Sequence, residues 1–327
     1  MQPGKLPNEL MAEIVFSNIR VKRDEVLVFP QVGMDCGVID FGEDVCVLST
    51  DPITGTSSDI GWLGVHIACN DVIAAGVEPL GLMLTIMAPP GTTESELYEI
   101  MSQADKASEE LNVAIVGGHT EITPAVTRTV LSTTAIGKAK KSRVMNMLTV
   151  KSGDYIIMTK TAGLEGTAII ATEREDELKK HLDSELVERA KNMIKDISVL
   201  KEGEIAVRVG VNRMHDATEG GVLGALWEMA DSSGLGIEVY GDKIPVAEET
   251  RAICDYLKIN PLRLISSGCL LIATSEKKLL SEELKKEGIK ATVVGRIVKK
   301  GRYIKSGTLK FPLEPPKSDE LYKVITN

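Results

Sequence analysis

This sequence of 327 residues contains few aromatic side chains. It has no closely paired cysteines, no excess of basic residues and no long apolar run. Aromatic residues account for only 4% of the chain, so its core must be built from aliphatic side chains and methionine. The five cysteines form no C-x-x-C pair, which argues against a zinc site or a disulfide framework and favours a reducing compartment. We interpret Cys36 and Cys269 as small buried residues rather than nucleophiles.

The charge balance excludes further classes of protein. The formal net charge is -9, whereas a nucleic-acid-binding protein usually presents a basic face. No run reaches the roughly 18 apolar residues of a membrane span. The N-terminal segment MQPGKLPNELMAEIVF is interrupted by polar residues where a signal peptide is continuously apolar. We expect a cytoplasmic protein without nucleic-acid or membrane partners, which needs a metal ion if it binds a polyphosphate.

Strand-like and helix-like segments alternate along the chain, which is typical of an α/β protein. The length suits two domains. Charge rises and apolar periodicity lapses near residues 140–152, so we expect one domain over residues 1–145 and another over 146–327. Residues 1–10 predict a mobile arm, overlapping a helix over residues 8–18. Strands are predicted over residues 25–29, 36–41 and 45–50.

The segment over residues 59–76 predicts a helix that is apolar on nearly every side, capped by Ser57 or Ser58. A helix without a polar face must be buried in a core or in an oligomer interface, and this one has more apolar surface than one domain readily covers. It nevertheless contains Asn70 and Asp71, and buried polar groups need partners. Asn70 could simply satisfy backbone groups, and His66 is interpreted as a hydrogen-bonded core histidine.

Two Gly-Gly pairs stand at the ends of predicted strands. A strand over residues 113–116, which follows a capping box at residues 93–96 and its helix, runs into Gly117, Gly118, His119 and Thr120. Asp216 similarly precedes a second pair, at residues 220–221, that opens a helix over residues 222–230. Glycines let backbone N–H groups approach phosphate oxygens closely.

Acidic residues end or interrupt several apolar runs, and the candidates for metal binding are Asp35, Asp51, Asp71 and Asp216. Carboxylates at strand ends suit Mg²⁺, which prefers oxygen ligands and bridges to substrate phosphates. The alternative for Asp51 is a turn, because it precedes a proline. The sequence contains no G-x-x-x-x-G-K-[ST] loop, no G-x-S-x-G elbow and no H-E-x-x-H motif.

The order of these motifs resembles the AIR-synthetase-like (PurM-like) superfamily. The resemblance rests on Asp35, TDP at residues 50–52, CNDVIAAGVEP, VGGHTEIT, GDYIIMTKTAGLEGTA, DATEGGVLGALWEMADSSGLGIEV and ISSGCLL, and covers nearly the whole chain. Within the superfamily the sequence is most similar to the hydrogenase maturation protein HypE.

The resemblance implies a two-domain α/β fold, with the N-terminal domains of two chains pairing into a dimeric β-barrel and a C-terminal α/β sandwich. It also implies ATP held with Mg²⁺ near the interface of a homodimer. The four aspartates match metal or phosphate positions, Asn70 lies alongside them, and Gly117 and Gly118 match phosphate-proximal glycines, followed by His119 and Thr120. Lys5 could reach a phosphate from the N-terminal arm.

Two positions depart from the HypE pattern. HypE proteins carry a carbamoyl group on a terminal cysteine, whereas the last cysteine here is Cys269. His119 stands where HypE-like relatives resemble GGDT, and histidine is a poor Mg²⁺ ligand. The leading hypothesis is an ATP- and Mg²⁺-dependent HypE-like enzyme that phosphorylates a small substrate or carrier group. The alternative is a non-catalytic nucleotide-binding partner in a maturation complex.

Overall fold

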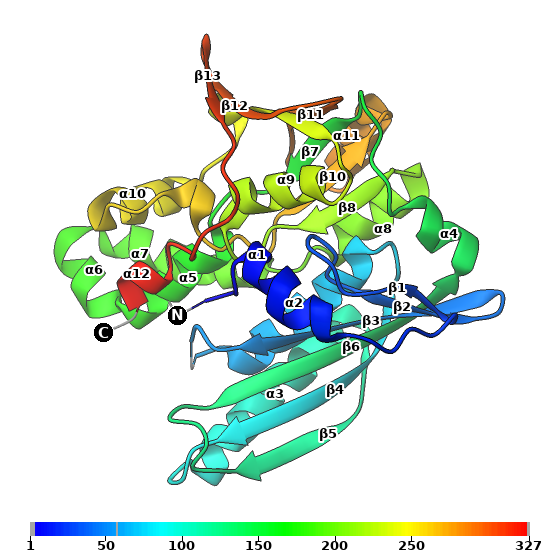
Figure 1. Ribbon diagram of the computed structural model, residues 1–327. Coiled ribbons are helices and arrows are strands. Elements are labelled where there is room, and N and C mark those ends of the chain that lie inside the picture. The colour runs from blue at the N-terminus through cyan, green and yellow to red at the C-terminus, as the bar shows by residue number, and fades with distance from the viewer. Residues whose placement is uncertain (1–3, 57, 326–327) are drawn as a thin grey trace.

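The computed structural model describes residues 4–56 and 58–325 as a mixed α/β chain built on two sheets (Figure 1). The first sheet has six strands in the order β1-β2-β3-β6-β4-β5, and the second has seven in the order β13-β12-β9-β11-β7-β10-β8. Strands of the first sheet are β1 (Val26–Val28), β2 (Gly37–Phe41), β3 (Asp44–Ile53), β4 (Pro79–Ala88), β5 (Ala114–Ile122) and β6 (Val130–Lys140). Those of the second are β7 (Tyr155–Thr159), β8 (Arg213–Asp216), β9 (Gly236–Tyr240), β10 (Leu270–Thr274), β11 (Ala291–Val298), β12 (Arg302–Ser306) and β13 (Leu309–Pro312).

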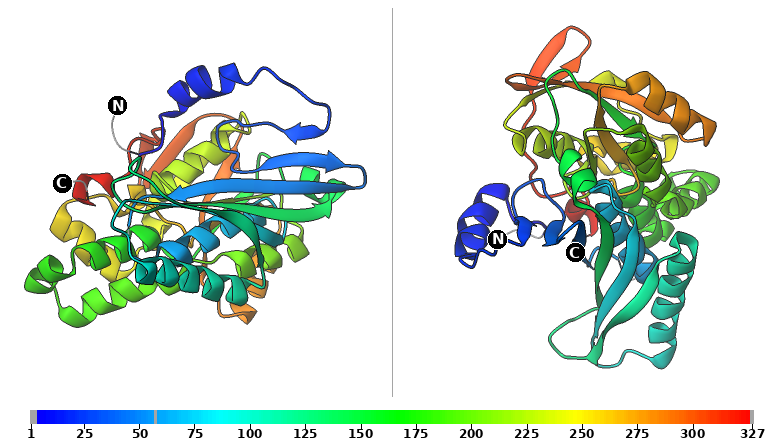
Figure 2. Two further views of the ribbon diagram at one scale, coloured as in Figure 1. Left: turned by 90° about the horizontal axis from the view of Figure 1, so that it is seen from below. Right: turned by 90° about the vertical axis from the view of Figure 1, so that its right-hand side faces the viewer.

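The first sheet is antiparallel except at one edge. β4 and β5 pair in parallel, and the helix α3 (Glu94–Leu111) connects them, as a parallel pair requires. Thr93 and Glu96 form the predicted capping box at the start of α3. In Figure 2 (right) α3 lies along one face of this sheet. The sheet is open among the described residues, and β5 forms its exposed edge.

The helix α2 (Ile60–Ala74) occupies the centre of the molecule. Every residue of α2 except Trp62 is buried, which confirms the prediction of a helix without a polar face. It contacts α3, β3 and β6 on the side of the first sheet, and β8 and α8 (Leu200–Val209) on the side of the second. The predicted serine cap is wrong for Ser58, because Asp59 precedes the helix in a left-handed conformation without a capping side chain. Ser57 lies outside the described residues.

The second sheet is covered on both faces. Ile156 and Met158 pack with α9 (Gly221–Asp231), whereas Ile157 between them packs with α8 and α11 (Lys277–Lys286). This alternation follows from the two-residue period of a strand, so each face of β7 serves a different core. Further helices are α4 (Lys141–Asn146), α5 (Leu164–Glu173), α6 (Glu175–His181), α7 (Ser184–Asn192), α10 (Glu248–Leu257) and α12 (Tyr322–Ile325).

The N-terminal segment is helical as predicted, although irregular. It runs from α1 (Asn8–Leu10) through a π-helical turn (Met11–Val15) into a 3₁₀ turn (Phe16–Asn18) and lies on the outside of the molecule (Figure 2). Residues 4 and 5 are held against the second half of the chain rather than forming a free arm, because the Lys5 N–H donates to Glu219 Oε2 at 2.7 Å. No helix in the described part of the chain is long and apolar enough to cross a bilayer.

Candidate functional site

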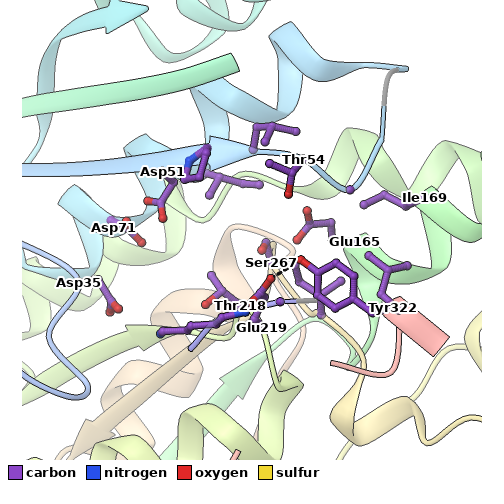
Figure 3. A pocket seen from close by; sticks show the side chains of 18 of the residues that line it. Asp35, Asp51, Thr54, Asp71, Glu165, Ile169, Thr218, Glu219, Ser267 and Tyr322 are labelled. Carbon is purple, nitrogen blue, oxygen red and sulfur yellow. Dashed lines mark hydrogen bonds between the residues drawn. The ribbon is translucent and has the colours of Figure 1, made fainter. Parts of the chain in front are cut away.

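A cavity of about 540 Å³ lies between the two halves of the chain (Figure 3). Its walls come from the end of β3 and the loop after it, from α2, from the start of α5, and from the loop between β8 and α9. Residues 264–268 and the C-terminal segment close the remaining side. The site is therefore built from segments that are far apart in the sequence.

Acidic side chains gather at one end of this cavity. Asp51 ends its apolar run inside β3, and Asp71 projects from the buried helix α2, with the Ser49 hydroxyl 2.6 Å from Asp71 Oδ2. Burial raises the pKa of Asp71 well above its usual value, and the charges of Asp51, Asp216 and Asp35 raise it further. Burial, together with the charge of Asp35, also raises the pKa of Asp216 to about 7. These four residues were predicted from the sequence, and the structure brings them together.

We call Asp35, Asp51, Asp71 and Asp216 the acidic cluster. Several of its carboxylate oxygens lack a hydrogen-bond partner. Oδ2 of Asp51 and both carboxylate oxygens of Asp216 are buried without a hydrogen-bond partner among the described residues. Such groups are costly unless a cation or donor meets them. Because the donors are all oxygens, a hard divalent cation such as Mg²⁺ fits the cluster.

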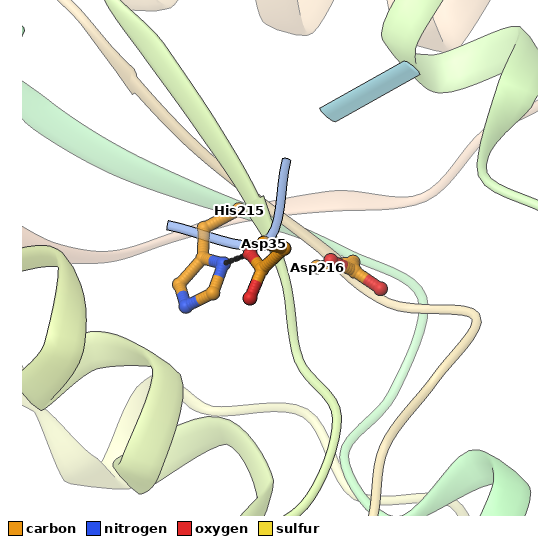
Figure 4. A group of neighbouring side chains, drawn as sticks. All are labelled: Asp35, His215 and Asp216. Carbon is orange, nitrogen blue, oxygen red and sulfur yellow. Dashed lines mark ion pairs between the residues drawn. The ribbon is translucent and has the colours of Figure 1, made fainter. Parts of the chain in front are cut away.

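His215 neutralises part of the cluster (Figure 4). Its Nδ1 lies 2.9 Å from Asp35 Oδ2, and its Nε2 lies 3.4 Å from Glu228 Oε2. Burial alone would lower the pKa of His215, but the two carboxylates outweigh burial and raise it to about 10. Burial would likewise raise the pKa of Asp35, but the charge of His215 and its hydrogen bond, with Lys5 and Arg213, lower it. His215 therefore positions the carboxylate of Asp35, and one ligand atom from each of Asp35, His215 and Asp216 lies within 4.8 Å of the others.

Lys5 supplies a cation at the same end. Its Nζ lies 3.8 Å from Glu228 Oε1, and the residue lines the cavity. Burial lowers the pKa of Lys5, but the charges of Glu228, Asp35 and Glu219 outweigh burial and raise it. The predicted phosphate-reaching lysine therefore stands at the cavity as a charged group.

The predicted Gly-Gly segment lies elsewhere. Gly117, Gly118, His119 and Thr120 belong to the exposed edge strand β5, and none of them lines the cavity in this chain. The predicted end of the strand at residue 116 is wrong, because β5 pairs with β4 as far as Ile122. Glycine is required at 118 by the sheet itself, since a Cβ there would lie 1.9 Å from the Leu84 carbonyl oxygen.

Asn70 is next to Asp71 in sequence but points away from the cavity. Its Nδ2 donates to the Ile197 carbonyl at 2.9 Å, and its Oδ1 accepts from the Val199 N–H at 2.9 Å. The side chain thus connects α2 to the segment before α8.

His66 is buried as expected but has no hydrogen-bond partner among the described residues, and burial lowers its pKa to about 4.

The thiols match their interpretation as buried residues. Cys36 and Cys269 are free and buried. Burial raises the pKa of Cys36 well above its usual value, and the acidic cluster adds to the rise. A thiol of this kind is a poor nucleophile at neutral pH.

The side chains at the opposite end of the cavity were not predicted from the sequence. Glu165, Glu219, Ser267, Tyr322 and Arg128 line it, and Tyr322 donates to Glu219 at 2.5 Å. A signal existed for Glu165, which stands at the start of a helix directly after a strand and turn in the segment GLEGTA. No local signal marks Tyr322, which reaches the cavity from near the other end of the chain.

Asp319 fixes the C-terminal segment at the cavity. Its carboxylate accepts hydrogen bonds from the backbone N–H groups of Gly220, Ile265 and Leu321, at 2.7, 3.1 and 2.9 Å. One buried side chain therefore connects three segments that line or adjoin the same cavity.

Family models match two segments of the chain. The N-terminal domain of AIR synthase related proteins matches residues 33–139, and their C-terminal domain matches residues 151–306. Together these segments include Asp35, Asp51, Asp71 and Asp216, but neither Lys5 nor the C-terminal segment.

Curated relatives are similar over most of their length. A protein of Methanocaldococcus jannaschii, provisionally named a hydrogenase expression/formation protein, is 29% identical over 84% of this chain and 81% of its own. The carbamoyl dehydratase HypE of Rhodobacter capsulatus is 27% identical over 76% of this chain and 72% of its own. A selenide, water dikinase of Caldanaerobacter subterraneus subsp. tengcongensis is 29% identical over 92% of this chain and 94% of its own.

Solved structures share the fold. HypE from a HypE–HypF complex superposes with a TM-score of 0.75 at 21% identity, covering 94% of this chain and 99% of that one. HypE in complex with ATP superposes with a TM-score of 0.70 at 22% identity, covering 96% and 95%. The α/β PurM-like fold that the motif order implies is therefore confirmed.

Proposed function

The chain belongs to the AIR synthase related proteins, and from this membership we propose that it is an enzyme that binds ATP with Mg²⁺ and transfers a phosphoryl group to a small acceptor. The observation that carries the proposal is the set of buried, unpartnered carboxylate oxygens of Asp51 and Asp216 beside Asp71. Structures of the same fold are known with ATP bound, and a relative is named a dikinase. Cys269 is buried and offers no accessible thiol at this site.

The chain's own residues would act mainly by positioning and by charge. Asp51, Asp71 and Asp216 would hold the metal ion, which when bound neutralises phosphate charge. His215 fixes the carboxylate of Asp35 beside them. Lys5 adds a positive charge at the mouth of the acidic cluster, where it could meet a phosphate oxygen. Phosphoryl transfer depends on such positioning and charge neutralisation more than on a nucleophilic side chain.

A homodimer is part of the proposal. The edge strand β5 is exposed, and Val116 and Ile122 on it are large apolar residues left in solvent, as are Leu80 and Met83 on β4. An exposed apolar edge of this kind needs a cover. A second copy of the chain would cover it and close the first sheet into a barrel, and residues 117–120 would then face a partner's nucleotide rather than their own. Asn70 would support the site by holding α2.

The relatives also motivate a partner and a location. HypE is known in a complex with HypF, and we propose that a maturation partner protein docks onto this chain too. ATP and Mg²⁺ are available in the cytoplasm, where we place the protein. If ATP binds without turnover, the non-catalytic role in such a complex becomes the better description.

The test is ATP turnover by the purified protein with Mg²⁺, following ADP and phosphate, with and without a fraction of cellular metabolites. Turnover that rises with a metabolite fraction is the expected result and identifies the acceptor. The variant to compare is Asp71→Asn, which should lose turnover because it lacks one charged metal ligand. Equal turnover by the two proteins would refute the assignment of the metal site.

A further inference from the structure

Glu165 is a buried carboxyl group that faces the cavity without a partner. It lies in the first turn of α5 and is 3% exposed, and its Oε2 has no hydrogen-bond partner among the described residues. Figure 3 shows it on the side of the cavity opposite Asp35 and Asp71. Its position therefore separates it from the acidic cluster that fits Mg²⁺.

Ser267 is a second unpartnered group in the same wall. The residue is fully buried, and its Oγ has no hydrogen-bond partner in the described part of the chain. The loop that carries it is fixed against α5, because Gly166 N–H donates to the Ile265 carbonyl and Gly163 N–H donates to Ser266 Oγ. Both groups are thus held in the same wall of the cavity by the fold.

Acidic side chains make up the charges that act most strongly on Glu165. Burial raises the pKa of Glu165 to about 8; the Ser267 hydroxyl opposes the rise, and the charges of Asp319, Glu219 and Asp216 add to it. The positive side chains that line the cavity are Lys5, which is paired with Glu228, and the exposed Arg128.

We propose that Glu165 and Ser267 form a subsite for a positively charged group that carries N–H donors, such as an ammonium or amidinium. A carboxylate and a hydroxyl oxygen can each accept a hydrogen bond from such a group, which would also offset the surrounding negative charge. An anionic group beside Glu165 would instead meet the like charges of Glu165 and Glu219, which line the same cavity. In the context of the proposed function, which this step extends, the charged group belongs to the molecule that receives the phosphoryl group.

The probe is acetamidinium, with acetate as the anion of matched size, observed by saturation-transfer NMR on the full chain. Excess Mg²⁺ and ATP are present, so that the acidic cluster is occupied, and the series is repeated without them. Acetamidinium should give a signal and acetate none. Glu165→Gln should weaken acetamidinium binding by about tenfold or more, because it removes a charge-assisted hydrogen bond at constant volume. Ser267→Ala should weaken it by a smaller factor.

A matched control is Glu185→Gln, which makes the same change on the exposed surface of α7 and should bind acetamidinium as the wild-type protein does. At pH 7 the wild-type protein should also release protons on binding, since a cation beside Glu165 favours the ionised carboxylate. Glu165→Gln should not. Calorimetry in buffers of different ionisation enthalpy measures this release.

Two outcomes overturn the inference: an acetamidinium signal that is equal in wild type and Glu165→Gln, or acetate binding as strongly as acetamidinium. The proposed function fails separately, if the wild-type protein does not bind ATP with Mg²⁺ while acetamidinium binding still depends on Glu165. The series without nucleotide keeps the two results distinct.

Discussion

The sequence indicates two groups of residues as nucleotide-binding candidates, the acidic cluster and residues 117–120. In the structure their environments are opposite. The acidic cluster is buried between the two halves of the chain and holds unpartnered oxygens. Residues 117–120 lie along an exposed edge strand, with His119 66% exposed and next to Glu121. A buried carboxylate without a partner demands a ligand, whereas polar side chains and backbone groups in contact with solvent do not. The cluster therefore identifies the site within one chain, and residues 117–120 can contribute only through a second chain.

The largest expected effect comes from the cluster. Asp71→Asn should weaken Mg²⁺-dependent ATP binding by about 100-fold, because it removes a ligand charge from a buried site at nearly constant volume. The thermal midpoint should stay near that of the wild type, since an amide has nearly the same volume as the carboxyl group that it replaces. Calorimetry and thermal unfolding measure the two quantities. Asp105→Asn, an exposed residue of α3, is the matched control.

The next effect is a pH dependence of metal binding. The pKa of Asp216 is about 7, so protons compete with Mg²⁺ below that value. Between pH 8 and pH 6 we expect Mg²⁺ affinity to fall by about tenfold. Asp216→Asn should bind Mg²⁺ more weakly and with a flatter profile. An equally steep profile in that variant would show that another group carries the proton.

Asp216 also makes the free energy of unfolding depend on pH in the metal-free protein. A carboxyl group whose pKa is higher in the folded protein than in the unfolded chain binds more protons when folded, so it favours folding below the unfolded pKa of about 3.9. This contribution is lost as pH rises through about 7. Unfolding in urea at a series of pH values should show the loss, and added Mg²⁺ should reverse it at high pH.

Asn70 should matter for stability rather than for the ligand. Asn70→Ala leaves the Ile197 carbonyl and the Val199 N–H without their buried partner, which should cost about 2–4 kcal/mol in the free energy of unfolding. Mg²⁺ affinity of the folded protein should change little. Loss of affinity with full stability would instead place Asn70 at the nucleotide.

The smallest expected effect is that of His119→Ala. Its side chain lies away from the cavity in one chain, so Mg²⁺ binding to the acidic cluster should stay within about twofold of wild type. ATP turnover is measured on the same sample. A loss of turnover with intact Mg²⁺ binding would indicate that a second chain brings residues 117–120 to the nucleotide, and sedimentation at several protein concentrations would then show the dimer.

The sequence could predict the fold and one end of the site for a physical reason. Four aspartates end or interrupt apolar runs, and a charge in such a position has to be compensated wherever the chain folds. By contrast, the environment of Gly118 depends on its pairing with Leu84 in β4, and that of Asn70 on residues more than 100 positions away. The Glu165 end escaped prediction because Ser267 and Tyr322 reach it from distant segments.

The C-terminal segment that Asp319 fixes at the cavity is also the last part of the chain to be translated. The acidic cluster draws three of its four members from the first quarter of the chain, yet the wall opposite needs Leu321 and Tyr322. Roughly 250 residues separate Asp71 from Leu321, which takes a ribosome on the order of 10 to 50 seconds. During that interval the nascent chain carries Asp35, Asp51 and Asp71 without the C-terminal segment that lines the cavity in the folded protein.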